Sequence, residues 1–83
     1  MDIQTEVLRA LDDVLSLQGR ASSFSADTPL LGAVPELDSM AVVTLITTLE
    51  ERFGLAIDDD EVSGETFATV GSLTQFVADA LRR

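Results

Sequence analysis

The apolar residues of this 83-residue chain recur at intervals of three and four, the spacing that puts side chains on one face of an α-helix. No stretch alternates between apolar and polar residues for long enough to predict a strand. A chain of this length also has little room for a second hydrophobic core. We therefore expect an all-α fold, a four-helix bundle formed by one domain over residues 1–83.

Acidic and hydroxyl side chains stand where the expected helices begin, because they accept bonds from the free N–H groups of a first turn. Asp2 is the candidate cap of the first helix, and Asp58–Glu61 has the pattern of a capping box that opens a short third helix. Either Thr69 or Ser72 caps the last helix, and the sequence does not choose between them. The predicted helices cover about residues 3–17, 39–53, 58–64 and 70–81.

A long loop, residues 20–37, connects the first two expected helices. It is too apolar for a flexible linker, and a loop this long in a small domain is usually packed down or functional. We expect it to lie across the core, with its large apolar side chains turned inward: Phe24, Leu30, Leu31 and Val34.

The chain lacks the residue types on which many catalytic sites depend. It contains no cysteine, histidine or lysine, so disulfides, thiolate sites, Ser–His–Asp triads and Ser–Lys pairs are excluded. We expect no intrinsic enzyme activity. No apolar run approaches the roughly 20 residues that span a bilayer, and the N-terminus lacks the basic start of a signal peptide. We expect a cytoplasmic protein.

The net charge of −10 is concentrated in one part of the chain. Residues 36–65 hold nine acidic residues against Arg52 alone, for a net charge of −8. Such a field repels nucleic acid and anionic membranes, and it steers the protein toward basic protein surfaces.

The second expected helix begins with a pair suited to carry a phosphate ester. Asp38 is well placed to cap this helix, and Ser39 falls on its first turn. The unpaired N–H groups and the helix dipole favour an anion at this end. Ser39 is therefore a candidate attachment site, although an ordinary polar residue in a first turn is the simpler reading of the pair alone.

In context, the chain resembles the acyl carrier protein family, including the related peptidyl and D-alanyl carrier domains. The resemblance covers nearly all 83 residues. It rests on Leu37-Asp38-Ser39-Met40, the helix to Phe53, Leu55-x-Ile57-x-Asp59 and Thr69-Val70-x-x-Leu73.

The resemblance implies that a phosphopantetheinyl transferase attaches 4′-phosphopantetheine from coenzyme A to Ser39, and that Asp38 is linked to the transferase and its metal. The cofactor's thiol would hold acyl intermediates as thioesters for partner enzymes. Two positions depart from the commonest family pattern, since Glu36 stands where glycine is usual and Met40 replaces leucine. Met40 favours an aminoacyl or D-alanyl carrier somewhat, so that class stays open.

One side of the second helix is a candidate docking surface for basic partner enzymes. We expect a monomer that presents there an apolar spot inside an acidic rim, formed by Met40, Val43, Thr44, Thr47, Glu50 and Glu51. Scattered exposed apolar residues are the alternative reading. Asp12 and Asp13, on the first helix, are expected to matter little for docking. The resemblance also makes Ile46 and Leu49, in the core, candidate walls of an acyl pocket.

Two readings outside the carrier class remain. The acids at Asp58–Glu61 suggest calcium, but an EF-hand loop needs glycine at its sixth place and glutamate at its twelfth, where this chain has Ser63 and Thr69. We therefore expect no specific metal site. An unmodified acidic helical module that docks a basic partner is the other alternative, and it would carry no covalent cofactor.

Overall fold

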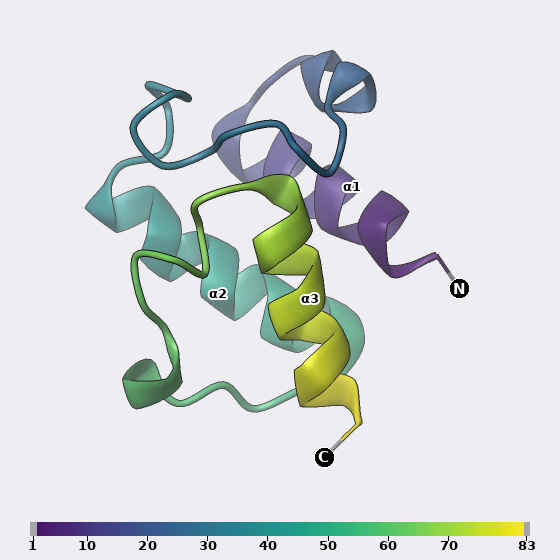
Figure 1. Ribbon diagram of the computed structural model, residues 1–83, viewed down its shortest axis with the longest axis vertical. Coiled ribbons are helices and arrows are strands. Elements are labelled where there is room, and N and C mark those ends of the chain that lie inside the picture. Colours follow the sequence, from purple (N-terminus) through teal and green to yellow (C-terminus); the bar gives the residue numbers. More distant parts are fainter. Residues whose placement is uncertain (1, 83) are drawn as a thin grey trace.

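The computed structural model describes residues 2–82, and three α-helices carry its fold (Figure 1). These are α1 (Ile3–Leu15), α2 (Ser39–Phe53) and α3 (Val70–Leu81), with short 3-10 helices η1 (Arg20–Ser23) and η2 (Asp59–Glu61) in the connections. Helix α1 contacts both α2 and α3, and the long loop crosses above them before it turns into α2. Within residues 2–82 there is no strand, only an isolated bridge between Pro29 and Thr69, so the all-α prediction is confirmed.

The predicted short third helix is a single 3-10 turn, η2. The Asp58 N–H donates to Glu61 Oε2 at 3.1 Å, which is one half of the predicted capping box. Because the first turn of a helix fixes several residues for one hydrogen bond, a segment that ends at Gly64 has too little length to recover that loss.

Helix α1 ends at Leu15, two residues earlier than the sequence pattern suggests. The cause is Asp12, which accepts hydrogen bonds from backbone N–H groups of the residues that follow the helix. The Asp12 carbonyl accepts the N–H groups of Ser16 and Leu17, and its carboxylate accepts those of Gly19 and Ala21, both at 3.2 Å. Ser16 and Gly19 have positive φ angles of 54° and 89°, so this turn is held in a conformation that ordinary residues avoid. Asp12 is thus a structural residue, not a free surface charge.

The start of α3 uses both of the predicted capping residues. Thr69 is the N-cap, and its hydroxyl oxygen accepts the Ser72 N–H at 3.0 Å. The Ser72 hydroxyl accepts the Thr69 N–H at 3.0 Å in return. The ambiguity in the sequence arose because the two residues form one reciprocal capping box.

The long loop is packed against the start of α3, as expected, but one of its four apolar side chains faces outward. Leu30 is fully buried, and Phe24 and Val34 are half-buried. The prediction for Leu31 is wrong, since this side chain is 48% exposed. The N–H groups of Leu30 and Leu31 donate to the carbonyls of Ala68 and Phe67. The chain turns directly after Leu30, whose carbonyl accepts the N–H groups of Ala33 and Val34, so Leu31 lies on the turn and its side chain leaves the core.

Candidate functional site

Ser39 is the first residue of α2, and its side chain is exposed. The predicted cap is confirmed: Asp38 Oδ1 accepts the Ala41 N–H at 2.8 Å, and the Asp38 carbonyl accepts the Val42 N–H at 2.9 Å. Asp38 therefore fixes the beginning of the helix and, with it, the place where the Ser39 hydroxyl emerges.

The same helix start fits a phosphate ester on Ser39. The N–H groups of Ser39 and Met40 belong to the first two helical residues, which have no carbonyl four residues back within the helix. These donors and the positive end of the helix dipole favour a phosphate at this position. The carboxylate of Asp38 is drawn to the third N–H of the turn, that of Ala41, so it does not occupy the first two.

A largely apolar groove of about 390 Å³ opens beside Ser39. It lies where the long loop, the start of α2 and the segment before α3 meet. Its lining residues are Leu31, Leu37, Asp38, Ser39, Val42, Val62, Ser63, Gly64 and Phe67.

The two predicted pocket residues do not line this groove. Leu49 lies in the hydrophobic core at 1% exposure, and Ile46 packs half-buried against that core. Sequence patterns missed the groove because its walls come from three separate segments. The glycine at position 32 was an available signal, since it favours a turn, and a turn at this point carries Leu31 away from the core.

Most of the predicted docking surface is exposed on α2. Met40 is 76% exposed and Val43 62% exposed, and Glu51 is also exposed. The hydroxyls of the exposed Thr44 and Thr47 donate to the carbonyls of Met40 and Val43, both at 3.2 Å. With these hydroxyls turned to the backbone, the surface is less polar than its sequence suggests.

Glu50 differs from the rest of this surface. It is half-buried, and its Oε2 accepts the Ile57 N–H at 2.8 Å. This bond ties the connection after α2 to the last turns of the helix. The carboxylate of Glu50 is therefore first a structural acceptor, and Glu51 is the freer charge of the two.

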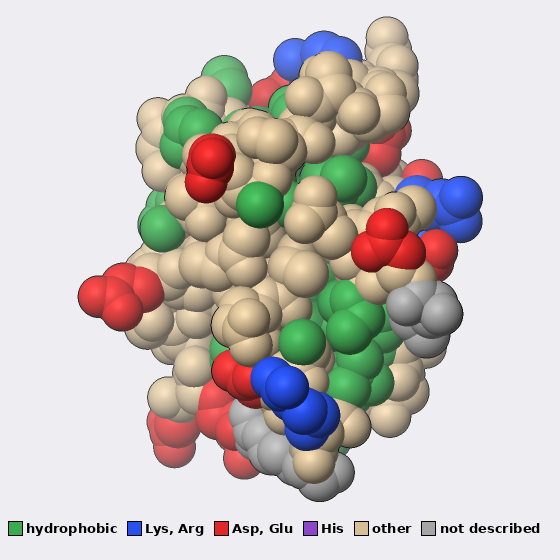
Figure 2. Space-filling view, turned by 45° about the vertical axis from the view of Figure 1, so that its right-hand side comes forward, with side chains coloured by type: hydrophobic (Ala, Val, Ile, Leu, Met, Phe, Trp, Pro, Cys, Tyr) green, Lys and Arg blue, Asp and Glu red, His purple; other side chains and the backbone are tan. Residues whose placement is uncertain are grey.

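The arginines of the described chain are paired with acids. Ion pairs join Arg9 to Glu6, Arg20 to Glu36, and Arg82 to Asp79. On the face drawn in Figure 2, each visible arginine lies beside a red acidic side chain, and further acids gather toward the lower left. The arginines therefore do little to neutralise the remaining acidic side chains of the chain.

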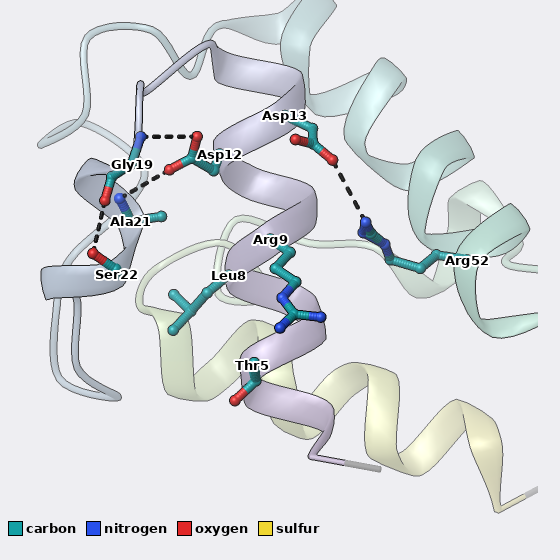
Figure 3. A pocket seen from close by; sticks show the side chains of 9 residues that line it. All are labelled: Thr5, Leu8, Arg9, Asp12, Asp13, Gly19, Ala21, Ser22 and Arg52. Atoms are coloured by element: carbon teal, nitrogen blue, oxygen red, sulfur yellow. Dashed lines mark hydrogen bonds and ion pairs between the residues drawn. The ribbon is translucent and has the colours of Figure 1, made fainter.

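A second cavity, of about 600 Å³, lies between α1, η1 and the end of α2, and it shares no residue with the groove beside Ser39 (Figure 3). Its polar groups already have partners within the protein. The Asp12 carboxylate accepts the Gly19 and Ala21 N–H groups, and the Ser22 hydroxyl donates to the Gly19 carbonyl at 2.8 Å. Thr5 and Arg9 donate to Asp2 and Glu6, which lie outside the cavity lining. Because these polar groups already have hydrogen-bond partners, we assign this cavity a structural role in the packing of α1, η1 and α2 and not a ligand-binding role.

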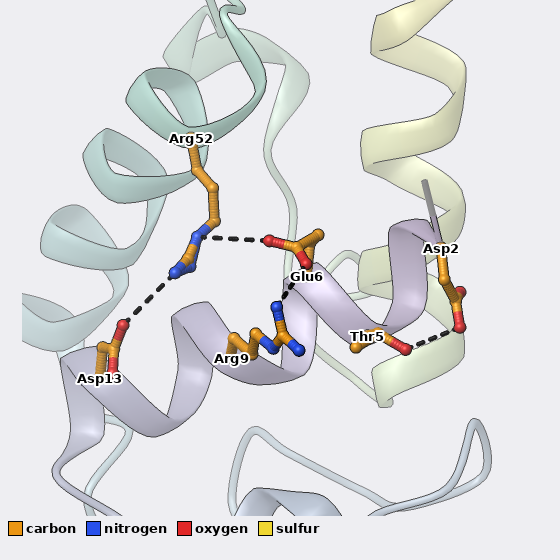
Figure 4. A network of polar contacts seen from close by, with 6 residues as sticks. All are labelled: Asp2, Thr5, Glu6, Arg9, Asp13 and Arg52. Carbon is orange, nitrogen blue, oxygen red and sulfur yellow. Dashed lines mark hydrogen bonds and ion pairs between the residues drawn. The ribbon is translucent and has the colours of Figure 1, made fainter.

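Arg52, at the end of α2, forms ion pairs with two acidic residues of α1 beside this cavity (Figure 4). Its Nη2 lies 3.5 Å from Asp13 Oδ2, and its Nε lies 4.0 Å from Glu6 Oε1. The one arginine of residues 36–65 is therefore directed to α1, away from the acids of its own segment.

Among the described residues, no group of three or more acidic side chains is placed to hold a metal ion. None of the helices within residues 2–82 is both long and apolar enough to cross a membrane.

Comparison with known proteins places this geometry in a family. A family model described as "Phosphopantetheine attachment site" matches residues 5–77. Acyl carrier proteins from Arthrobacter sp. (strain FB24) and Acidothermus cellulolyticus are each 38% identical over 45 residues, which is 54% of this chain. These matches cover 53% and 51% of the relatives, so the chain spans about half the length of the curated relatives it matches.

A solved structure gives the same answer over the full length. The solution NMR structure of a holo acyl carrier protein from Nitrosomonas europaea is 49% identical, with a TM-score of 0.92 and complete coverage of both chains. The match in fold therefore includes the long loop and the segment before α3 that frame Ser39. The chain belongs to the acyl carrier protein family, which is defined by a phosphopantetheine attachment site.

Proposed function

We propose that this chain is an acyl carrier that holds 4′-phosphopantetheine on Ser39 and presents the attached acyl group to partner enzymes. The observation that carries the proposal is the exposed Ser39 at the capped start of α2, next to an apolar groove. Residues 1–83 act as one carrier domain in this proposal, and the domain itself catalyses no reaction.

Each residue at the start of α2 has its own role in the attachment of phosphopantetheine. Ser39 supplies the hydroxyl oxygen that becomes esterified, and the Ser39 and Met40 N–H groups favour the phosphate charge. Asp38 keeps the first turn in place through Ala41 and adds an acidic group for the transferase and its metal. When attached, phosphopantetheine supplies the thiol that this cysteine-free chain lacks, and the thiol holds the acyl group as a thioester.

The groove favours an apolar acyl group over an aminoacyl group as cargo. Leu31, Val42 and Phe67 contribute apolar walls directly beside Ser39. Ile46 and Leu49 would join this lining if the core opened further, because Ile46 lies one helical turn beyond Val42. A charged ammonium group would find mostly apolar side chains there, which disfavours an aminoacyl or D-alanyl cargo in the groove.

Partner enzymes would dock on the exposed side of α2, through Met40, Val43, Thr44, Thr47 and Glu51. The phosphopantetheinyl transferase and the enzymes that load or process the acyl group are the expected partners, with basic docking surfaces. Glu50 belongs to this surface less than the others, since its carboxylate holds Ile57. Nucleic acid would be repelled by the charge of −10. We propose that the protein acts as a monomer in the cytoplasm.

Thiol titration tests the carrier function, because the unmodified chain has no thiol of its own. After incubation with coenzyme A and a broad-specificity phosphopantetheinyl transferase, the purified protein should react with a thiol reagent at one equivalent per chain. Protein incubated without the transferase should show no reaction. An absence of thiol after treatment with several transferases would favour the unmodified acidic interaction module.

A further inference from the structure

The ion pair between Arg20 and Glu36 joins two segments that are far apart in sequence, and one of its members stands just before Ser39 in the chain. Arg20 Nη2 lies 2.5 Å from Glu36 Oε2. Arg20 belongs to η1, while Glu36 lies three residues before Ser39. The side chain of Arg20 is held at its other side as well, because its Nε donates to the Leu17 carbonyl at 3.1 Å.

Hydrogen bonds continue from Glu36 into the first turn of α2. The Asp38 N–H donates to the Glu36 carbonyl at 3.2 Å, so the backbone of Glu36 sets the direction in which the chain enters the cap. Asp38 in turn accepts the Ala41 N–H at 2.8 Å. A connected path thus runs from the Arg20 guanidinium through Glu36 and Asp38 to the turn that carries Ser39.

Glu36 depends on Arg20 to stay in this position. Its second carboxylate oxygen, Oε1, is buried and makes no hydrogen bond. Hydrogen bonding by Arg20 lowers the pKa of Glu36 below its ordinary value, which is the direction expected when the ionised form is held by a cation. Without Arg20, the carboxylate would gain by turning toward water, and the backbone of the turn would lose its anchor.

An exposed ion pair adds little to the free energy of folding, so stability alone does not account for this arrangement. We propose that Arg20 and Glu36 are positioning residues for phosphopantetheine attachment: their ion pair fixes the turn into α2 and thereby the direction in which the Ser39 hydroxyl is presented. The proposal rests on the carrier function of Ser39. It adds a role for two residues that lie outside α2, the helix to which Ser39 belongs.

The test compares Arg20→Gln, Glu36→Gln and the charge-exchanged R20E/E36R double variant. Modification by coenzyme A and a broad-specificity phosphopantetheinyl transferase is followed at fixed ionic strength. Each single variant should lower kcat about threefold to tenfold, below the roughly hundredfold that a 1 Å misplacement can cause, with a smaller change in KM. The double variant should recover most of the lost kcat, because it restores the pair with the charges exchanged.

A long-range effect of charge would give a different result. Arg20→Gln makes the protein more negative and Glu36→Gln makes it less negative, so altered steering would shift KM in opposite directions. Opposite shifts, unchanged rates in both single variants, or a double variant no better than the singles would overturn the proposal. As a matched control, Arg82→Gln removes the 2.5 Å pair with Asp79 near the C-terminus, and its kcat should equal that of the wild type.

Hydrogen exchange keeps this test separate from the proposed function. In both single variants the Asp38 and Ala41 N–H groups should exchange faster, while the melting temperature stays close to that of the wild type. Unchanged exchange at these two amides would contradict the positioning role even if modification proceeds. If the wild type is never modified but the Asp38 and Ala41 amides exchange faster in the two variants, the proposed carrier function is wrong. In that case the effect of the Arg20–Glu36 pair on the first turn of α2 is still supported.

Discussion

At the scale of single residues, the hydrogen bond from Arg20 favours the ionised form of Glu36. The hydrogen bond from Arg20 lowers the pKa of Glu36 from its ordinary value of 4.5, as Arg82 lowers that of Asp79 from 3.8. Above these ordinary values the carboxylates are ionised in both the folded and the unfolded chain, and the pairs contribute in full. As the pH falls through the lowered folded-state pKa, the carboxyl is protonated and the contribution is lost.

We therefore expect the stability difference between wild type and Glu36→Gln to shrink on acidification. Urea unfolding at about pH 6 should give a slightly higher midpoint for the wild type, a small difference because the pair is exposed. This difference should narrow as the pH falls below the ordinary pKa of 4.5. The comparison isolates Glu36 because both proteins share all other titrating groups. A gap that is constant or that widens in acid would contradict the pairing.

At the scale of elements, the end of α1 depends on one side chain. Asp12→Ala removes the acceptor of the Gly19 and Ala21 N–H groups, so it should lower the free energy of unfolding by about 1–3 kcal/mol. Asp13→Ala is the matched control, because Asp13 is exposed and pairs only with Arg52 within this part of the structure. Its effect should stay within about 0–1 kcal/mol. Equal losses in chemical denaturation would show that Asp12 does not organise the turn.

The exposed side of α2 should dominate recognition by basic partners. Glu51→Lys should weaken binding to a broad-specificity phosphopantetheinyl transferase about twofold to fivefold, since one exposed pair contributes about 0–1 kcal/mol. The matched control is Asp27→Lys, which changes the net charge equally from an exposed loop position. Titration calorimetry at low and high salt would measure both variants. Equal weakening by the control would place recognition elsewhere or in the overall charge.

The sequence predicted α2 and α3 with their residue bounds and the cap by Asp38, because helical spacing and capping depend on residues close in the chain. It did not predict contacts between distant segments. The bond from Ile57 to Glu50 and the Arg20–Glu36 pair depend on how the connections fold back. The groove beside Ser39 was missed for the same reason, and the attachment at Ser39 stays a prediction.

At the scale of the whole molecule, unpaired acids should limit stability at low ionic strength. The chain has 15 acidic residues and 5 arginines, and Arg52 is directed away from the acidic segment. Salt screens repulsion and ion pairs alike, but the repelling charges are more numerous. The melting temperature should therefore rise with added sodium chloride or millimolar magnesium. A flat or falling melting temperature would show that the ion pairs dominate instead.

In the proposed function, Ser39 is the residue that carries phosphopantetheine. The most direct measurement is the intact mass of wild type, Ser39→Ala and Ser63→Ala after incubation with coenzyme A and a broad-specificity phosphopantetheinyl transferase. Ser63 is an exposed serine of the same groove, so its variant controls for the loss of a nearby hydroxyl. Wild type and Ser63→Ala should each gain the mass of one phosphopantetheine, and Ser39→Ala should gain none. A mass gain in Ser39→Ala, or none in the wild type with several transferases, would contradict the assignment.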